Sequence, residues 1–228
     1  MFLINMPDEI AILRRMSGPY NLDTYFLVCQ QTGEAIIIDP GDDTRSVLGF
    51  IREKKISPTK LIHTHGHADP FFSTTVFKQT HDIPSCLHAR DNLFFKDPGV
   101  RKETQRLVGL LPPYPADIEL FHEDRIFFGR ESLTVIHTPG HTLGSVCFLW
   151  KNHLFTGDAL FAGEAGRTDL PGGNLNQLIS SIRDRIMVLD KKTIIHPGHH
   201  HAGSRTQSTL EKEIRENIYI TDFILDAG

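Results

Sequence analysis

The stretch THGHAD at residues 64–69, followed directly by Pro70, decides how this chain is interpreted. Imidazole nitrogen and carboxylate oxygen bind zinc and similar metals tightly, and catalytic sites use few enough of these donors to leave room for water. The apolar run before the motif predicts a strand, and alternate residues of an extended chain point to the same side. We therefore expect His65 and His67 to face one ion, with Asp69 continuing the alternation.

Three later segments each place a histidine or an aspartate beside glycine after a strand-like run. They are HTPGH at residues 137–141, TGD at 156–158 and HPGH at 196–199. Glycine allows tight turns and close backbone approach at a strand end. Ligands so far apart in sequence converge only through the fold, and the joint pattern favours metal ligation by His65, His67 and His141.

Together these motifs read THGHAD, GH, GD and PGH, and their order and spacing resemble the metallo-β-lactamase superfamily over nearly the whole chain. The resemblance implies an α/β protein with an αββα sandwich fold, in which two mixed sheets are flanked by helices and the site lies at one edge of both sheets. A chain of 228 residues with 39% hydrophobic content fits one domain, residues 1–228.

The superfamily normally has a further histidine where this chain has Pro70. The resemblance then implies a first site of three histidines, an aspartate that bridges two sites, and a second site that is one nitrogen poorer than usual. The corresponding residues are His65, His67 and His141 for the first site, Asp158 for the bridge, and Asp69 with His199 for the second. We expect one tightly bound zinc and a second ion that is weak or absent, with iron or manganese as alternatives.

The run GDALFAGEAGRTDLPGGN at residues 157–174 resembles the small glyoxalase II-like (hydroxyacylglutathione hydrolase-like) enzymes. This resemblance implies a metal-dependent hydrolase of thioesters. An ion in the first site would lower the pKa of bound water to about 7, so that a metal-bound hydroxide attacks the substrate. Asp69 and Asp158 are the expected catalytic carboxylates, and Asp69 would orient the water or accept its proton.

Two further residues are predicted to support this chemistry. Asp39, in the Asp-Pro-Gly turn at residues 39–41, matches the early aspartate turn of the superfamily and is expected to hydrogen-bond a ligand histidine. Arg167 is a candidate for an anionic group of the substrate because guanidinium binds carboxylates in a fork. A salt bridge from Arg167 to Asp169 or Glu164 is an equally good interpretation.

Two alternatives to the hydrolase remain open. Persulfide dioxygenases, which are iron oxidoreductases, share the Gly-Arg-Thr-Asp segment at residues 166–169, and loss of one second-site histidine makes a mononuclear iron site easier to accept. The second alternative is a relative of these enzymes that binds metal but has lost catalysis. The presence of every first-site ligand counts against it. Only 29 residues follow His199, so we expect no long helical C-terminal region like the one with which glyoxalase II enzymes bind glutathione, and the thiol carrier stays open.

Two other regions have more than one interpretation. His200 or His201 could replace the donor missing at Pro70, although a solvated loop is the simpler expectation. Residues 89–117 are rich in proline and hold basic side chains, which predicts an insertion outside the sheets that either covers the site or is a plain surface excursion.

Composition excludes several classes of partner. The formal net charge of −4 and the scattered Lys and Arg residues offer no basic face for nucleic acid. Cys29, Cys86 and Cys147 are isolated, which predicts reduced core thiols rather than disulfides. No secretory signal or membrane span is recognised, so we expect a cytoplasmic protein that acts on a small molecule, with the oligomeric state undetermined.

The alternation of patterns predicts strands and helices in layers. Strands are expected at residues 10–13, 24–29, 34–39, 60–63, 85–87, 133–137, 146–150 and 153–155, and helices at 72–79 and 174–189. Asp43 or Thr44 is expected to cap a helix near residues 44–51. Ser208 with Glu211 predicts a capping box for the last helix.

Overall fold

The computed structural model describes residues 10–17, 21–41, 43–99, 102, 115–200 and 205–225, without the side chains at positions 17, 68–72, 75, 79 and 94. Within these residues no helix is both long enough and apolar enough to cross a membrane.

The first half of the chain forms a six-stranded sheet whose strands follow one another in chain order. They are β1 (Ile10–Ser17), β2 (Leu22–Cys29), β3 (Glu34–Ile38), β4 (Ser57–Ile62), β5 (Ser85–His88) and β6 (Ile118–Leu120). The first three pair antiparallel, and β3 to β6 pair parallel. Three helices follow β3, β4 and β5: α1 (Thr44–Lys54), α2 (Ala68–His81) and α3 (Ala89–Lys96).

The second half forms another six-stranded sheet, in the order β12-β11-β10-β9-β8-β7. Its strands are β7 (Arg125–Phe128), β8 (Glu131–His137), β9 (Val146–Trp150), β10 (His153–Gly157), β11 (Ile194–Pro197) and β12 (Ser208–Thr209). Only the pair of β10 and β11 is parallel among these ladders. The helical elements are α5 (Leu175–Ser181), η1 (Ile182–Ile186), α6 (Leu210–Glu216), α7 (Ile218–Ile220) and η2 (Thr221–Leu225).

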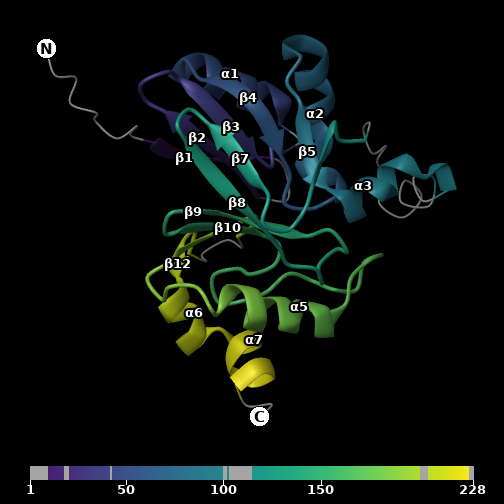
Figure 1. The fold of residues 1–228 in the computed structure, drawn as a ribbon, viewed down its shortest axis with the longest axis vertical. Coiled ribbons are helices and arrows are strands. Elements are labelled where there is room, and N and C mark those ends of the chain that lie inside the picture. The colour runs from purple at the N-terminus through teal and green to yellow at the C-terminus, as the bar shows by residue number, and fades with distance from the viewer. Residues whose placement is uncertain are drawn as a thin grey trace, which may run out of the picture.

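Side chains of alternate residues divide the core into layers, as a period of two requires. On β2, Tyr25 and Leu27 join a cluster shared by both sheets, whereas Phe26 packs in a cluster with residues of α1 and α2. On the other sheet, a third cluster packs α5, η1, α6 and α7 onto the strands, with Leu178 and Ile182 fully buried. Figure 1 shows helices on the outer faces of the two sheets, which confirms the predicted αββα sandwich.

Several local predictions hold. Asp43 caps α1, and its carboxylate accepts a hydrogen bond of 2.9 Å from the backbone N–H of Ser46. The helix predicted from residue 174 is present as α5, and Asn174 is its N-cap, accepting from the backbone N–H of Gln177. The three cysteines are free and buried, as expected.

The predicted cap of the last helix is wrong by one residue. Thr209, not Ser208, is the N-cap of α6, because β12 extends through Ser208 and Thr209 and pairs with β11. The helix predicted at residues 174–189 also changes character, since Ile182–Ile186 form a π-helical turn that closes when Met187 N–H donates to the Ile182 carbonyl at 2.8 Å. Strands β6 and β7 and helix α3 were not predicted.

Candidate metal centre

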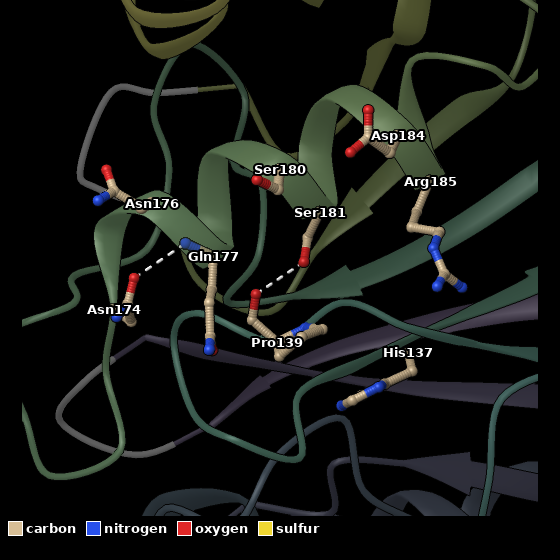
Figure 2. Close-up of a pocket in the computed structure, with 9 residues that line it drawn as sticks. All are labelled: His137, Pro139, Asn174, Asn176, Gln177, Ser180, Ser181, Asp184 and Arg185. Atoms are coloured by element: carbon tan, nitrogen blue, oxygen red, sulfur yellow. Dashed lines mark hydrogen bonds between the residues drawn. The ribbon is translucent and has the colours of Figure 1, made fainter.

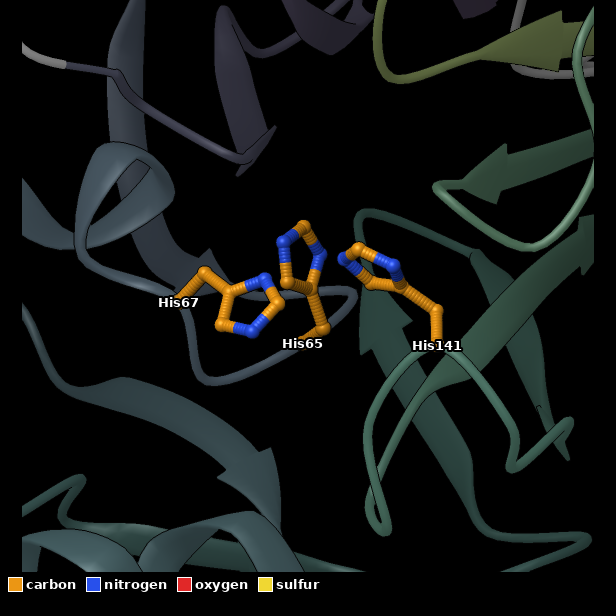
Figure 3. A group of neighbouring side chains, drawn as sticks. All are labelled: His65, His67 and His141. Atoms are coloured by element: carbon orange, nitrogen blue, oxygen red, sulfur yellow. The ribbon is translucent and has the colours of Figure 1, made fainter. Parts of the chain in front are cut away.

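Three histidines from two loops come together where the sheets meet. His65 and His67 lie between β4 and α2, and His141 lies between β8 and β9. One ring nitrogen from each lies within 4.8 Å of the others. The ring centroids are 4.6–5.0 Å apart, and Figure 3 shows the imidazoles converging. His65 and His141 are almost fully buried. The predicted histidine trio is therefore a compact group in the structure.

Hydrogen bonds fix which nitrogen of His141 is available to a metal. Its Nδ1 lies 2.8 Å from the backbone carbonyl of Arg167, and a carbonyl can only accept. Nδ1 must therefore carry a proton, so in the neutral imidazole the lone pair is on Nε2. That Nε2 atom is buried and has no hydrogen-bond partner within the described residues. A buried imidazole nitrogen with this geometry suits a metal ligand.

His65 reaches the same state by a longer chain of hydrogen bonds. The hydroxyl of Thr64 donates to Asp39 Oδ2 at 2.7 Å, so it can only accept from Nδ1 of His65, 3.0 Å away. The lone pair of His65 is again on Nε2, which is buried and lacks a hydrogen-bond partner in the part of the chain described. Burial, and secondarily the neighbouring His141, hold the pKa of His65 well below its ordinary value. The neutral form needed for a metal ligand is thus favoured.

Asp39 supports the site by way of Thr64. It accepts from both the backbone N–H of Thr64, at 2.9 Å, and the Thr64 hydroxyl. Its own backbone has a φ of +48°, in the left-handed region that costs strain for a residue other than glycine. This turn directs the Asp39 carboxylate toward the loop that carries His65 and His67. Sequence reasoning chose Asp39 but missed Thr64, whose only signal was a hydroxyl directly before a ligand histidine.

Asp158 lies between the histidine group and His199. Its Oδ2 is 3.5 Å from Nε2 of His141, and its Oδ1 is 2.7 Å from Nδ1 of His199. Burial alone would raise the pKa of Asp158, but the charge and hydrogen bond of His199, followed by His141 and His65, outweigh burial and hold this pKa well below the usual range. Asp158 is therefore a partly buried, ionised carboxylate.

Glycines make room for this carboxylate. Gly157 has a φ of +49°, and a Cβ there would lie 2.3 Å from the hydroxyl oxygen of Thr64. A Cβ at Gly166 would lie 1.8 Å from the carbonyl oxygen of Asp158. Only glycine lets residue 157 approach Thr64, and residue 166 approach the Asp158 carbonyl, so closely.

The remaining predicted second-site donors are only partly described. Asp69 and Pro70 lie in the first turn of α2, and their side chains are outside the described part of the structure. The roles given to Asp69 and to the missing donor at Pro70 therefore stay predictions. His200 pairs with the buried Asp23, Nδ1 to Oδ2 3.0 Å, and His201 is outside the described residues.

Arg167 contributes to the centre through its backbone. Its carbonyl oxygen accepts a hydrogen bond from Nδ1 of His141. Its exposed guanidinium binds both carboxylate oxygens of Asp169, at 2.7 Å each. The charge and hydrogen bonds of Asp169 raise the pKa of Arg167, and those of Arg167 lower the pKa of Asp169 to about 2. The salt bridge to Asp169 is one of the two interpretations that the sequence left open.

The turn that carries His141 is held from outside by α5. The hydroxyl of Ser181 donates to the Pro139 carbonyl at 2.7 Å, as Figure 2 shows. Gly140 approaches so closely that a Cβ there would lie 2.3 Å from the Leu178 nitrogen. A polar groove runs along this contact, and the three histidines are not among its lining residues, which are His137, Pro139, Asn174, Asn176, Gln177, Ser180, Ser181, Asp184 and Arg185.

The segment predicted as an insertion begins with helix α3. Asp91 and Asn92 of this helix are fully buried, and much of the segment, residues 100–101 and 103–114, is outside the described residues. Asp91 accepts hydrogen bonds from the loop that carries His65 and His67 and from the loop that carries His141, and it was not singled out from the sequence. Nothing in its local pattern signals that role.

Comparison with known proteins agrees with this geometry. Residues 18–199 match the family model of the metallo-beta-lactamase superfamily. A probable metallo-hydrolase of Bacillus subtilis is 30% identical, over 93% of this chain and 99% of that protein. The hydroxyacylglutathione hydrolase GloC of Haemophilus influenzae is 33% identical, over 85% and 91%. The mitochondrial persulfide dioxygenase of Mus musculus is 31% identical, over 92% and 76%.

Solved structures agree as well. The crystal structure of BLEG-1, a B3 metallo-beta-lactamase, superposes with a TM-score of 0.83 at 31% identity, over 92% of this chain and all of that one. A di-iron-bound form of TTHA1623 gives 0.76 at 30% identity, over 90% and 98%. The fold and the histidine group together imply a bound metal.

Proposed function

Because the chain belongs to the metallo-β-lactamase superfamily, we propose that it is a metal-dependent hydrolase that cleaves thioesters or related esters. The observation that carries this proposal is the pair of buried Nε2 lone pairs on His65 and His141, beside the ionised carboxylate of Asp158. The similarity to GloC, a hydroxyacylglutathione hydrolase, supports thioesters as the substrate class.

A divalent metal, when bound, lowers the pKa of water and polarises a carbonyl oxygen. The chain supplies the rest. The Thr64 hydroxyl and the Arg167 carbonyl accept hydrogen bonds from Nδ1 of His65 and His141, so Nε2 of each ring would hold the metal, and the Asp158 carboxylate would accept a hydrogen bond from the reacting water. The oxygen of water adds to the carbonyl carbon, the carbon–sulfur bond breaks, and an acid and a thiol are released. Asp69 is our candidate to take the proton.

We infer that the substrate is a small anionic thioester. Arg167 is exposed and lies in the same segment that hydrogen-bonds His141, so its guanidinium can exchange Asp169 for a carboxylate of the substrate. Zinc in one tight site is the proposed metal. Iron is the alternative, and a relative solved in a di-iron-bound form supports it.

A sulfur dioxygenase with a single iron is the second candidate. The similarity to a persulfide dioxygenase favours it, at 31% identity over 92% of this chain. The two reactions consume different substrates, so one experiment separates them.

Protein purified without added metal is analysed for zinc, iron and manganese, reconstituted with each, and assayed in parallel. A hydrolase releases free thiol from a glutathione thioester without consuming oxygen. A dioxygenase consumes oxygen with a glutathione persulfide and needs iron. Oxygen uptake on the persulfide combined with an inert thioester would overturn the hydrolase proposal in favour of the second candidate. Inactivity in both assays, with metal bound, would overturn both.

A further inference from the structure

Helix α3 presents one buried carboxylate to both loops that carry the histidine group. Asp91 is fully buried at the beginning of this helix. Its Oδ2 accepts from the backbone N–H of Gly66 at 2.7 Å and from the Thr142 hydroxyl at 2.6 Å, and its Oδ1 accepts from the backbone N–H of Gly144 at 2.6 Å. All three donors belong to ligand loops.

The position of these donors along the chain matters. Gly66 lies between the ligands His65 and His67, and Thr142 directly follows the ligand His141. The two loops come from different sheets, one after β4 and the other after β8. Asp91 therefore bridges the two sheets at the point where the three imidazoles converge.

The contact is also sterically closed. A Cβ at Gly66 would lie 2.9 Å from the Asp91 side chain, and one at Gly144 would lie 2.6 Å from it. The glycines bring both loop backbones against a single carboxylate, so a shift of that carboxylate moves both loops. Burial raises the pKa of Asp91 above its ordinary value, and its three hydrogen bonds offset only part of that rise.

We propose that Asp91 is a positioning residue that holds the His65–His67 loop and the His141 loop at the separation a metal ion requires. It touches neither metal nor substrate and acts through Gly66, Thr142 and Gly144. This inference rests on the metal centre of the proposed function but is independent of the reaction catalysed. Residues that orient metal ligands are generally worth about 10- to 100-fold in metal affinity.

The test compares Asp91 with its neighbour Asn92. Asn92 is equally buried in α3, but its side chain bonds Ala116 and Glu119 instead of a ligand loop. Asp91→Asn keeps the size and replaces one acceptor oxygen with a donor, which must oppose one of the three donors. Asn92→Ala weakens the same helix without touching either loop, so it controls for lost stability.

The measurement uses metal-free protein, Zn²⁺ added in competition with a chromophoric chelator, and the absorption spectrum with Co²⁺ as a probe of ligand geometry. Thermal unfolding of the metal-free variants is recorded in parallel. We expect Asp91→Asn to weaken Zn²⁺ binding about 10- to 100-fold and to alter the Co²⁺ spectrum. Asn92→Ala should lower the unfolding temperature and leave affinity and spectrum as in the wild type.

Wild-type affinity in Asp91→Asn, or an equal loss of affinity in Asn92→Ala, would overturn the role of Asp91. If Asp91→Asn does not fold, Thr142→Val and Thr142→Ser replace it. The valine removes one of the three hydrogen bonds and should weaken binding, whereas the serine keeps it and should not; equal affinities would again overturn the inference. Failure of the wild-type protein to bind any metal would instead overturn the proposed function.

Discussion

The histidine trio and the pair of Asp158 and His199 are the two halves of the proposed metal centre, and their hydrogen bonds differ. In the trio, the Thr64 hydroxyl and the Arg167 carbonyl accept hydrogen bonds from Nδ1 of His65 and His141. The Nε2 atoms of both rings are buried and have no hydrogen bond in the described structure. In the pair, the His199 Nδ1 proton is donated to Asp158 Oδ1 at 2.7 Å. The trio thus offers nitrogen atoms to a cation, whereas Asp158 and His199 already hydrogen-bond each other.

This difference sets an order of binding. An ion at the trio meets the imidazoles of His65 and His141, whose Nδ1 hydrogen bonds fix their orientation beforehand, with His67 beside them. An ion at the second position competes with the His199 proton for Asp158, and Pro70 supplies no donor atom. We therefore expect one tight ion and one weak one, and the predictions below test that contrast.

The largest effect is expected from removing a trio ligand. His141→Ala should lose the tight ion and reduce activity by about 1,000-fold or more, because the metal contributes several kcal/mol to the barrier. His199→Ala should keep one ion per chain and lose less activity. Elemental analysis after dialysis, with circular dichroism to confirm folding, checks both. An active, metal-free His141→Ala protein would refute the metalloenzyme altogether.

Acid should destabilise the metal-free protein through buried histidines outside the centre. Burial, then neighbouring charges, lowers the pKa of His88 to about 4 and that of His196 to about 3. The unfolded chain therefore takes up protons first, so this stability is fully present above about pH 6.5 and is lost as the pH falls towards 4. The loss is on the order of 3 kcal/mol for each histidine at pH 4.

Urea unfolding of metal-free protein between pH 7.5 and 4 measures this loss. His88→Gln should flatten the profile, whereas the same change at the exposed His81 should not. If the free energy of unfolding of His88→Gln depends on pH as in the wild type, His88 is not the group through which acid acts. The same measurement would then be made on variants of the histidine trio. The experiment thus separates acid effects on the fold from acid effects on the centre.

Restoring the donor atom missing at residue 70 should reduce the difference in affinity between the first and the second ion. Pro70→His adds an imidazole directly after Asp69, and we expect affinity for a second ion to rise about tenfold, in line with one added ligand. A hydrolase should keep or gain activity, because an added Lewis acid shares developing charge, whereas a mononuclear dioxygenase should lose activity. Titration calorimetry measures the second ion, and Pro70→Ala controls for loss of the ring. No added binding would show that residue 70 points away from the centre.

The smallest effect is expected at Arg167. Its backbone carbonyl, which serves His141, survives in Arg167→Ala, so metal content should stay at the wild-type level. Loss of the exposed guanidinium should raise KM for an anionic thioester about tenfold and change kcat little. A neutral thioester is the matched control and should show no change in KM. A drop in metal content would contradict the separation of backbone and side-chain roles.

The layers of the fold and the trio were predictable because they depend on local patterns. Period-two strands, glycine beside each ligand and the THGHAD run all lie within short windows of sequence. The cap of the last helix was not, because Ser208 and Thr209 both carry hydroxyls and pairing of β12 with β11 decides between them. Asp91 and the carbonyl of Arg167 were missed because their partners lie in other loops, 25 or more residues away.

The two sheets are consecutive along the chain, and that order bears on how the protein is made. During synthesis β6 leaves the ribosome at Leu120, before any strand of the second sheet. The inward side of the first sheet, with Leu27 and Ile36, has by then no opposing sheet to cover it. His65 and His67 must wait for His141 in the same way. We therefore expect the metal to bind late in biogenesis. Binding by all three histidines requires that the two sheets have already packed against each other.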